Sequence, residues 1–443
     1  MLSLRFANVF DSRVGPDGIS DYDYAGSLQA AKDAVAQVGT PGFTRLDELR
    51  KAALKVKAFA AKRRKLRNFV QIGIGGSSLG AIAIQTALRH RWHNETATPR
   101  MYYLDNVDPE ETAALFDHLD PNETLYHIVT KSGETTETLA GFLIALDQVR
   151  RKLKTKWQDH FVVTTDPAKG FLRAWVGREK IASFEVPPDV GGRFSVLTPV
   201  GLVPAAFSGI DPLALIAGAE EAQKETMIAS KIALLSWLLD TRRKKRIHVM
   251  MPYSRALRDL ADWWRQLWAE SLGKNKTLNG QDSVTGATPV VALGATDQHS
   301  QVQLYTEGPN DKFFLLIQVA TFRDDIKIPK ALSDPAFDFV VGRQMGEILE
   351  AERKGTEAAL TAAKRPNATL TLGEISPRSV GAFFQTFEWA TAIAGQLYNV
   401  NAFDQPGVEA GKKAAFALLD RKGYEAQKAD VLKRLESDPR FTI

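Results

Sequence analysis

Hydrophobic and polar positions follow two alternating periods along most of the chain. Stretches with apolar residues three and four apart favour amphipathic helices, and short apolar runs between them favour buried strands. In the first half the runs lie at 69–74, 101–104, 125–129 and 161–164, and the helical stretches at 25–62, 109–119 and 134–149. Strands that alternate with helices are typical of parallel sheets covered by helices on both faces. The pattern therefore predicts an α/β fold.

The second half of the chain repeats this order of elements. A helical stretch at 227–239 and a basic cluster precede the apolar run 247–252, much as a helix and the cluster 62–67 precede the run 69–74. A repeated pattern without repeated residues indicates two similarly folded α/β domains. The later elements expected are a strand at 313–319 and helices at 342–364 and 380–397.

These elements suggest four segments, with a Gly- and Pro-rich loop at 187–199 joining the two halves. We expect an N-terminal helical segment packed on the body, two domains and a C-terminal helical arm, at 1–65, 66–205, 206–398 and 399–443.

Composition narrows the class of protein. The chain has 443 residues, of which 44% are hydrophobic and 25% charged, the ordinary mix of a globular protein. No apolar run approaches the ~20 residues that span a bilayer, and the N-terminus does not resemble a secretory signal. Because the chain contains no Cys, disulfides, thiolate metal sites and Cys nucleophiles are excluded. A cytoplasmic protein is the default expectation.

The net charge of +5 is modest for this length. Three short basic clusters, at 62–67, 151–154 and 242–246, each follow a helix-like stretch, where Lys and Arg favour the helix dipole. We interpret them as solvated helix ends, and we expect neither nucleic-acid nor membrane binding. A small anionic ligand remains compatible with the positive excess.

The first candidate for chemistry is a glycine-rich turn, GIGGSSLG at 73–80, between a strand and a helix. Small residues let backbone N–H groups and a hydroxyl approach a phosphate at a helix N-terminus. Dinucleotide binding would require Gly at position 78, where Ser stands, and a P-loop would require a following Lys. Tight packing between strand and helix is the alternative interpretation.

A second turn, VTKSGETTET at 129–138, also follows a strand and opens a helix. It offers hydroxyls, a Lys and free helix N–H groups around one point, a combination suited to a phosphate ester. One such turn is more often a helix cap. Two turns in adjacent units of a parallel sheet indicate a ligand at the carboxyl ends of the strands.

Together with GGRFSVLTPVGL at 191–202, these turns resemble the sugar-isomerase (SIS) family of phosphosugar-binding domains, and within it the glucose-6-phosphate isomerases. Three later segments agree with the family's motifs: QLWAESLGK, GATDQHS and NAFDQPGVEAGK, at 266–274, 294–300 and 401–412. The matches run from about residue 70 to 413 in the family's order. The chain is similar in length to the family's compact bacterial members. The resemblance implies two SIS-type α-β-α sandwich domains with parallel sheets and a helical C-terminal arm.

The resemblance also implies reversible interconversion of glucose 6-phosphate and fructose 6-phosphate by ring opening and proton transfer through a cis-enediol. Phosphate and substrate contacts fall on Gly76, Ser77, Thr130, Lys131, Ser132, Thr135, Gln266 and Gln405. Glu134 adds a negative charge beside the second turn, where the family's longer enzymes usually carry a neutral residue. Gln266 lies one helical turn before Glu270 on the same face.

The catalytic roles implied by the resemblance rest on four residues. Glu270 would be the base that moves a proton between C2 and C1, since a carboxylate can accept it from one carbon and return it to the next. Arg193 would stabilise the enediolate with a permanent charge. His299, oriented by Glu137, and Lys412 would open the ring. In this family the His comes from the partner subunit, which implies a homodimer.

The chemistry requires no metal and no cofactor. Each assignment has a structural alternative: a solvated Glu near a helix end, an exposed His in a loop, or a structural Arg. Two other functions also fit the motifs, an isomerase that acts on mannose 6-phosphate as well, and a regulatory phosphosugar-binding protein without catalysis. The joint presence of Glu270, Arg193, His299 and Lys412 argues against a mere sensor, which needs only the phosphate anchor.

Overall fold

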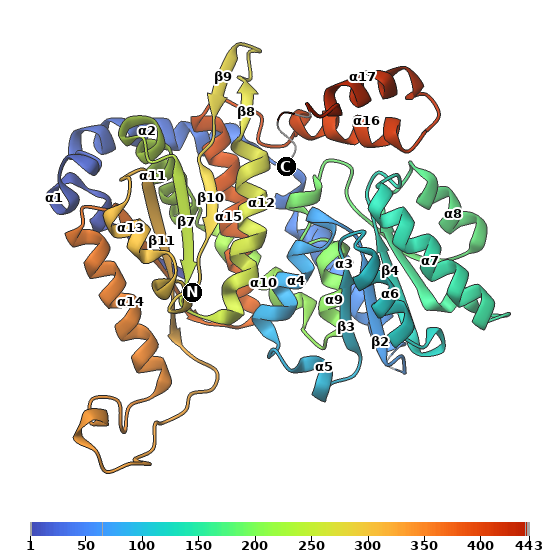
Figure 1. Cartoon of the computed structure of the whole chain (residues 1–443), viewed down its shortest axis with the longest axis horizontal. Coiled ribbons are helices and arrows are strands. Elements are labelled where there is room, and N and C mark those ends of the chain that lie inside the picture. Colours follow the sequence, from blue (N-terminus) through green and yellow to red (C-terminus); the bar gives the residue numbers. More distant parts are fainter. Residues whose placement is uncertain (1, 64, 439, 441–443) are drawn as a thin grey trace.

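The computed structural model describes residues 2–63, 65–438 and 440. Two five-stranded sheets, each flanked by helices, lie side by side with a bundle of helices between them (Figure 1). This arrangement confirms the α/β class predicted from the alternating periods.

The first sheet is entirely parallel, in the order β3-β2-β4-β5-β6. Four of its strands coincide with the predicted apolar runs: β2 (Asn68–Ile72), β3 (Arg100–Leu104), β4 (Thr124–Val129) and β5 (Phe161–Thr165). The short edge strand β6 (Ala182–Glu185) was not predicted, because it is only partly buried.

Side chains of this sheet alternate between two hydrophobic cores. Phe69 of β2 packs into the core shared with the second half of the chain, whereas its neighbour Val70 packs into the outer core. The outer core involves α6 (Pro109–His118), α7 (Thr136–Lys152) and α8 (Phe171–Glu179). The inner face meets α3 (Leu46–Ala61), α4 (Leu79–Leu88) and α9 (Pro199–Phe207). Burial on both faces explains why these strands are continuous apolar runs.

The second sheet has the order β1-β12-β11-β7-β10. Its members β7 (Ile247–Pro252), β10 (Thr288–Val291), β11 (Lys312–Thr321) and β12 (Asn367–Glu374) are parallel. Strand β1 (Leu2–Arg5) joins β12 in antiparallel register. The helical segment expected at 1–65 thus begins with a strand that was not predicted, because four residues with alternating burial are too weak a signal.

Helices cover both faces of the second sheet. The central one, α15 (Pro377–Leu397), is buried along nearly its whole length and makes its main helix contacts with four others. These are α2 (Asp21–Val38), α10 (Pro212–Lys224), α11 (Met227–Arg243) and α12 (Arg258–Leu272). The other face carries α13 (Val302–Glu307) and α14 (Met345–Ala362), which pack against a separate small core. Helix α12 also contacts α4, so it joins the two halves.

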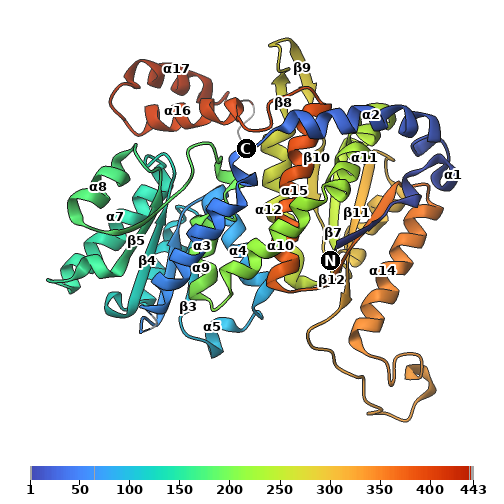
Figure 2. The same ribbon diagram turned by 180° about the vertical axis from the view of Figure 1, so that it is seen from behind.

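The C-terminal arm consists of α16 (Glu409–Leu418) and α17 (Glu425–Leu435). Both views place the arm over the end of the first domain near α7 and α8 (Figures 1 and 2). The last part of the predicted arm, Pro439 and 441–443, lies outside the described residues. The remaining short elements are α1 (Asp11–Val14), α5 (His93–Thr96), β8 (Lys274–Lys276) and β9 (Asp282–Thr285).

The basic cluster at 242–246 is not the fully solvated helix end that was predicted, because one of its residues is buried. Lys245 is only 1% exposed, and its ammonium group donates to Asp17 at 2.7 Å and to the carbonyl of Asn310 at 2.5 Å. A buried ammonium group needs such partners. In the first cluster, Arg64 lies outside the described residues. Within the part of the chain that the structure describes, no helix is long and apolar enough to cross a membrane.

Candidate functional site

The two turns singled out in the sequence meet at the carboxyl ends of neighbouring strands. The short 3₁₀ helix Gly75–Ser77 follows β2, and Thr130 follows β4, which pairs with β2. Gly73 lies between them, since a Cβ there would stand 2.9 Å from both the Ser77 Cβ and the Val129 carbonyl oxygen. A larger residue at position 73 would separate the turns. The parallel sheet thus brings Ser77 next to the hydroxyl-rich turn.

Hydroxyl groups of the second turn form a cluster. The Thr130 Oγ1 lies 2.9 Å from Thr135 Oγ1 and 3.4 Å from Ser132 Oγ, within hydrogen-bonding distance of both. Thr135 stands at the N-cap of α7, where free backbone N–H groups and the helix dipole favour an anion. The cluster has the chemistry expected of a phosphate anchor.

Two charged residues of this turn point away from the hydroxyls. The ammonium group of Lys131 donates to the carbonyls of Pro188 and Val190, at 2.6 and 3.0 Å. Burial lowers the pKa of Lys131, and Asp166 and Asp189 partly oppose that effect. Glu134 accepts a hydrogen bond at 2.9 Å from Arg421, which lies between α16 and α17. Its carboxylate therefore faces the C-terminal arm.

A row of buried, hydrogen-bonded polar side chains lies beneath the first turn, and the sequence motifs did not indicate it. The Gln71 side chain in β2 donates to the Ser77 carbonyl at 2.7 Å. Its Oε1 lies 3.0 Å from His127 Nδ1, and His127 Nε2 lies 2.7 Å from Thr164 Oγ1. Burial lowers the pKa of His127 to about 3, so the imidazole is neutral at physiological pH. These contacts fix the position of Ser77. Polar residues inside otherwise apolar strand runs were the only available signal.

Glu270 lies in the last turn of α12 with its side chain 30% exposed. Gln266, one turn earlier, donates from Nε2 to Glu270 Oε1 at 2.9 Å, so the predicted shared face brings them into contact. The same Nε2 atom would stand 2.9 Å from a Cβ on Gly75. The carboxylate is therefore linked through Gln266 to the glycine-rich turn.

Arg193 is the most connected side chain of the site. It lies in the 3₁₀ helix Gly192–Phe194, and Gly76 packs so closely on Gly192 that a Cβ at position 76 would stand 2.3 Å from its carbonyl carbon. The guanidinium makes five hydrogen bonds, to Ser271 Oγ (2.7 Å), Glu270 Oε2 (3.3 Å), Gln405 Oε1 (2.8 Å) and the carbonyls of Ala402 (2.6 Å) and Asp404 (2.9 Å). Burial lowers the pKa of Arg193, while Glu270 and Asp404 oppose that effect.

Lys274 is a further member of the site to which the motifs assigned no role. Its ammonium group donates to the carbonyls of Glu270 and Asp404, at 2.5 and 2.7 Å. Burial lowers the pKa of Lys274, and the nearby Arg193 charge lowers it further. A cavity of about 670 Å³ opens here, and Glu270, Lys274 and Gln405 are among the residues that line it. Its mixture of a carboxylate, amides and an ammonium group suits a polyhydroxylated ligand.

Two predicted catalytic residues are not joined to this cluster. His299 is exposed in the 3₁₀ helix Thr296–His299, which leads into α13 on the flank away from the first domain (Figure 1). Between the described residues His299 and Glu137 there is no hydrogen bond. Lys412 on α16 has a side chain that is 55% exposed, and its ammonium group donates to Glu409 at 3.1 Å. Within one chain the site thus contains Glu270 and the hydroxyl-rich turn without these two groups.

Comparisons with known proteins agree on one family. The family model described as phosphoglucose isomerase matches residues 32–432. A protein of Carboxydothermus hydrogenoformans named glucose-6-phosphate isomerase is 40% identical, with 100% of this chain and 99% of the relative covered. One of the same name from Rubrobacter xylanophilus is 43% identical, with coverage of 96% and 99%.

Solved structures give the same picture of the fold. A hypothetical protein of Thermus thermophilus superimposes with a TM-score of 0.83 at 37% identity, covering 95% of this chain and 99% of its own. A glucose-6-phosphate isomerase of Chlamydia trachomatis has a TM-score of 0.81 at 20% identity, with coverage of 98% and 92%, and so supports the fold alone. Since the family model matches most of the chain and the relatives cover nearly all of it, this chain belongs to the phosphoglucose isomerase family.

Proposed function

We propose that this protein interconverts glucose 6-phosphate and fructose 6-phosphate, with Glu270 as the base that moves the proton between C2 and C1. The observation that carries the proposal is the position of the Glu270 carboxylate. It is held between the Gln266 amide and the Arg193 guanidinium, and both of these residues adjoin the glycine-rich turn. A partly exposed carboxylate fixed by hydrogen bonds is suited to repeated proton transfer.

The other residues of the site bind the substrate. Ser77, Thr130, Ser132 and Thr135 anchor the phosphate at the strand ends. Lys131 adds positive charge to the same turn, although its ammonium group donates to the loop carbonyls of Pro188 and Val190. Gln405, which lines the cavity next to Glu270, and Gln266, which contacts Glu270, bind substrate hydroxyls.

Arg193 places a permanent positive charge where the enediolate develops its negative charge. These steps use a carboxylate, hydroxyls and fixed cations, so the proposal invokes neither a metal nor a cofactor.

Ring opening completes the reaction and needs groups that a single chain does not bring to the site. We assign it to His299 of a second subunit, oriented by Glu137, together with Lys412. A homodimer is supported by an extended loop that projects beyond α14 in both views (Figures 1 and 2). This loop exposes large apolar side chains: Ile326 (70%), Leu332 (62%), Phe337 (44%) and Phe339 (72%). Exposed apolar surface of this kind is typical of an interface. A sugar phosphate substrate also supports a cytoplasmic location.

The proton transfer can be tested directly. Purified protein is incubated with fructose 6-phosphate in D₂O that contains a chelator, and the products are followed by NMR. Deuterium at C2 of newly formed glucose 6-phosphate is the expected result. Label in mannose 6-phosphate as well would extend the substrate range. If folded protein binds the phosphosugar without exchange or product, the isomerase assignment is wrong and a regulatory binding role replaces it.

The shared site can be tested by complementation between two inactive variants, Glu270→Gln and His299→Gln. In a hybrid dimer one of the two sites would contain an intact Glu270 from one subunit and an intact His299 from the other. Co-expression with random pairing should therefore restore about a quarter of wild-type activity. If each site uses the His of its own chain, the co-expressed variants stay inactive.

A further inference from the structure

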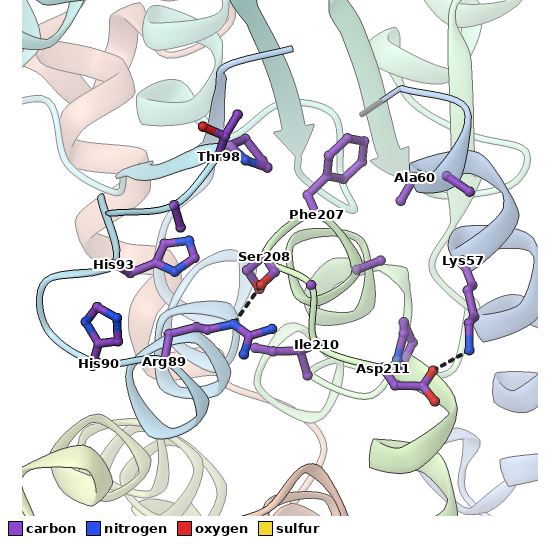
Figure 3. Close-up of a pocket in the computed structure, with 16 residues that line it drawn as sticks. Lys57, Ala60, Arg89, His90, His93, Thr98, Phe207, Ser208, Ile210 and Asp211 are labelled. Atoms are coloured by element: carbon purple, nitrogen blue, oxygen red, sulfur yellow. Dashed lines mark hydrogen bonds and ion pairs between the residues drawn. The ribbon is translucent and has the colours of Figure 1, made fainter. Parts of the chain in front are cut away.

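A second cavity lies apart from the residues discussed so far. It has a volume of about 790 Å³ and is enclosed by the C-terminal ends of α3 and α4, by α5, and by the connection from α9 to α10 (Figure 3). None of the residues proposed to bind or convert the sugar phosphate lines it. The volume falls within the range of about 300–1,000 Å³ that is typical of small-molecule sites.

The polar lining of this cavity is mainly cationic. Arg89 lies beside His90 and His93 on one side of the cavity, and Lys57 lies on the opposite side (Figure 3). The only carboxylate among the described residues that line the cavity is Asp211, which already pairs with Lys57 at 3.0 Å. The positive charge of Arg89 is consequently not neutralised by a carboxylate of the described lining.

The chain adds further positive charge behind Arg89. The guanidinium of Arg323 donates to the carbonyls of Ala87 and Leu88 at the end of α4, at 3.0 and 3.1 Å. Burial lowers the pKa of Arg89, and the charge of Arg323 lowers it further. The Arg89 Nε donates to the Ser208 carbonyl at 2.7 Å, which fixes the direction of the guanidinium. Two neighbouring guanidinium groups are costly unless a negative charge compensates them.

His93 is a second, independent indication of a ligand. The residue is 8% exposed, and its Nε2 atom is buried without a hydrogen-bond partner among the described residues. Buried polar atoms are normally paired, so an unpaired one requires a reason. Burial and the nearby Arg89 charge both lower the pKa of His93, which keeps the ring neutral in the absence of an anion.

Besides Thr98 and Ser208, most of the remaining lining is apolar. Phe207, Pro99, Ala60, Ala206 and Ile210 contribute to the wall. A cationic group beside an apolar wall is the usual form of a site for an organic anion, because the charge fixes orientation and the wall supplies contact area.

We propose that this cavity binds a small organic anion, with its phosphate or carboxylate group at Arg89 and the two histidines and its apolar body against Phe207. The site lies at the C-terminal end of α4, whereas the N-terminal end of the same helix follows the Ser77 turn. It is therefore a binding site in addition to the sugar phosphate site, and it does not depend on the isomerase assignment.

The test uses the full-length protein with its histidine rings labelled with ¹⁵N. The chain has only 7 His residues, so ring signals of His90 and His93 can be assigned separately from that of His299. Phenyl phosphate and benzoate should each shift the His90 and His93 signals in a saturable way. Inorganic phosphate should bind more weakly, and phenol should not saturate the site. Equal binding of phenol and phenyl phosphate would overturn the proposal, and equal binding of inorganic and phenyl phosphate would overturn its apolar half.

Two variants identify the charges responsible. Arg89→Gln should weaken phenyl phosphate binding about 10- to 100-fold, the usual effect of losing a charge-assisted hydrogen bond. Lys57→Gln should weaken it as well, because it leaves the Asp211 carboxylate unpaired inside the cavity. Arg91→Gln is the matched control, since Arg91 is exposed and does not line the cavity.

Circular dichroism of each variant reports that it is folded, and isomerase turnover should be unchanged because none of these residues belongs to the proposed catalytic site. Should the histidine shifts persist with wild-type affinity in Lys57→Gln and Arg89→Gln, the cavity is not an anion site. Should Arg89→Gln fail to fold, Lys57→Gln alone decides the question.

Discussion

Removing the guanidinium of Arg193 should damage stability and turnover together. In Arg193→Met an apolar side chain of similar length replaces a group that is only 2% exposed and makes five hydrogen bonds. The buried Ala402 carbonyl would lose its donor, and a buried acceptor without a partner costs about 1–3 kcal/mol. The Asp404 carbonyl keeps the Lys274 ammonium group as a donor. Loss of the Arg193–Glu270 contact adds little to the loss of stability, because the Glu270 side chain is 30% exposed and keeps its hydrogen bond from Gln266. Met also removes the cost of burying a charge, so we expect a net loss of stability of about 1–3 kcal/mol.

The effect on turnover follows from the same contacts. Without Arg193, Glu270 and Gln405 lose the group that connects them, and a misplacement of about 1 Å can lower the rate roughly 10²-fold. Urea denaturation followed by tryptophan fluorescence measures the stability, and conversion of fructose 6-phosphate measures kcat. Arg193→Lys separates charge from geometry, because Lys keeps the charge without the five-donor fork. Unchanged urea midpoints in Arg193→Met, or full recovery of kcat in Arg193→Lys, would refute this reasoning.

Three further changes have defined outcomes. Glu270→Gln should lower kcat about 10²- to 10⁴-fold while the dissociation constant of the sugar phosphate changes little; retention of deuterium exchange would contradict its role as the base. Arg421→Ala should leave the melting temperature nearly unchanged, since an exposed ion pair contributes ~0.2–1 kcal/mol. It should nevertheless speed tryptic cleavage of the C-terminal arm relative to the control variant Arg434→Ala. Equal cleavage rates in the two variants would count against the Arg421–Glu134 contact. His127 has its pKa lowered to about 3 in the folded protein, so the unfolded chain binds the proton first as the pH falls below ~6.5. The contribution of neutral His127 to the free energy of unfolding is complete above that pH and is lost toward pH 3, by up to ~1.4 kcal/mol per pH unit. His127→Gln should therefore reduce the dependence of the urea midpoint on pH between 7 and 5.

The fold was predictable wherever burial and periodicity act together. The run at 247–252 coincides with β7, and the long amphipathic stretches coincide with α11, α14 and α15 to within a few residues. Strand β12 was missed because its buried positions include polar residues. Asn367 and Thr369 are 0% and 1% exposed, and they are paired through Asn8, Arg353 and Glu357. A polar network that spans distant segments makes a buried strand resemble a loop in sequence.

The candidate site was predictable to the extent that its contacts are local. Gln266 and Glu270 are four residues apart on one helix, so their contact follows from helix geometry. By contrast, Glu134 meets Arg421 across 287 residues, and Lys131 donates to the loop at 188–190. The sequence contains no periodic signal for such pairs. Their direction is decided by how the arm and the loop pack on the first domain.

These long-range contacts attach the C-terminal arm to residues of the candidate site at two places. Its first end is fixed at Ala402–Gln405, where Arg193 and Lys274 hold the backbone and Gln405 beside Glu270. Its far end is fixed at Arg421, which contacts Glu134 in the hydroxyl-rich turn. Lys412 lies between these two attachments on α16, which is exposed along most of its length. A displacement of α16 would therefore move Lys412 while Glu270 keeps its hydrogen bonds to Arg193 and Gln266. If the proposed roles hold, ring opening and proton transfer would then depend on separate parts of the chain.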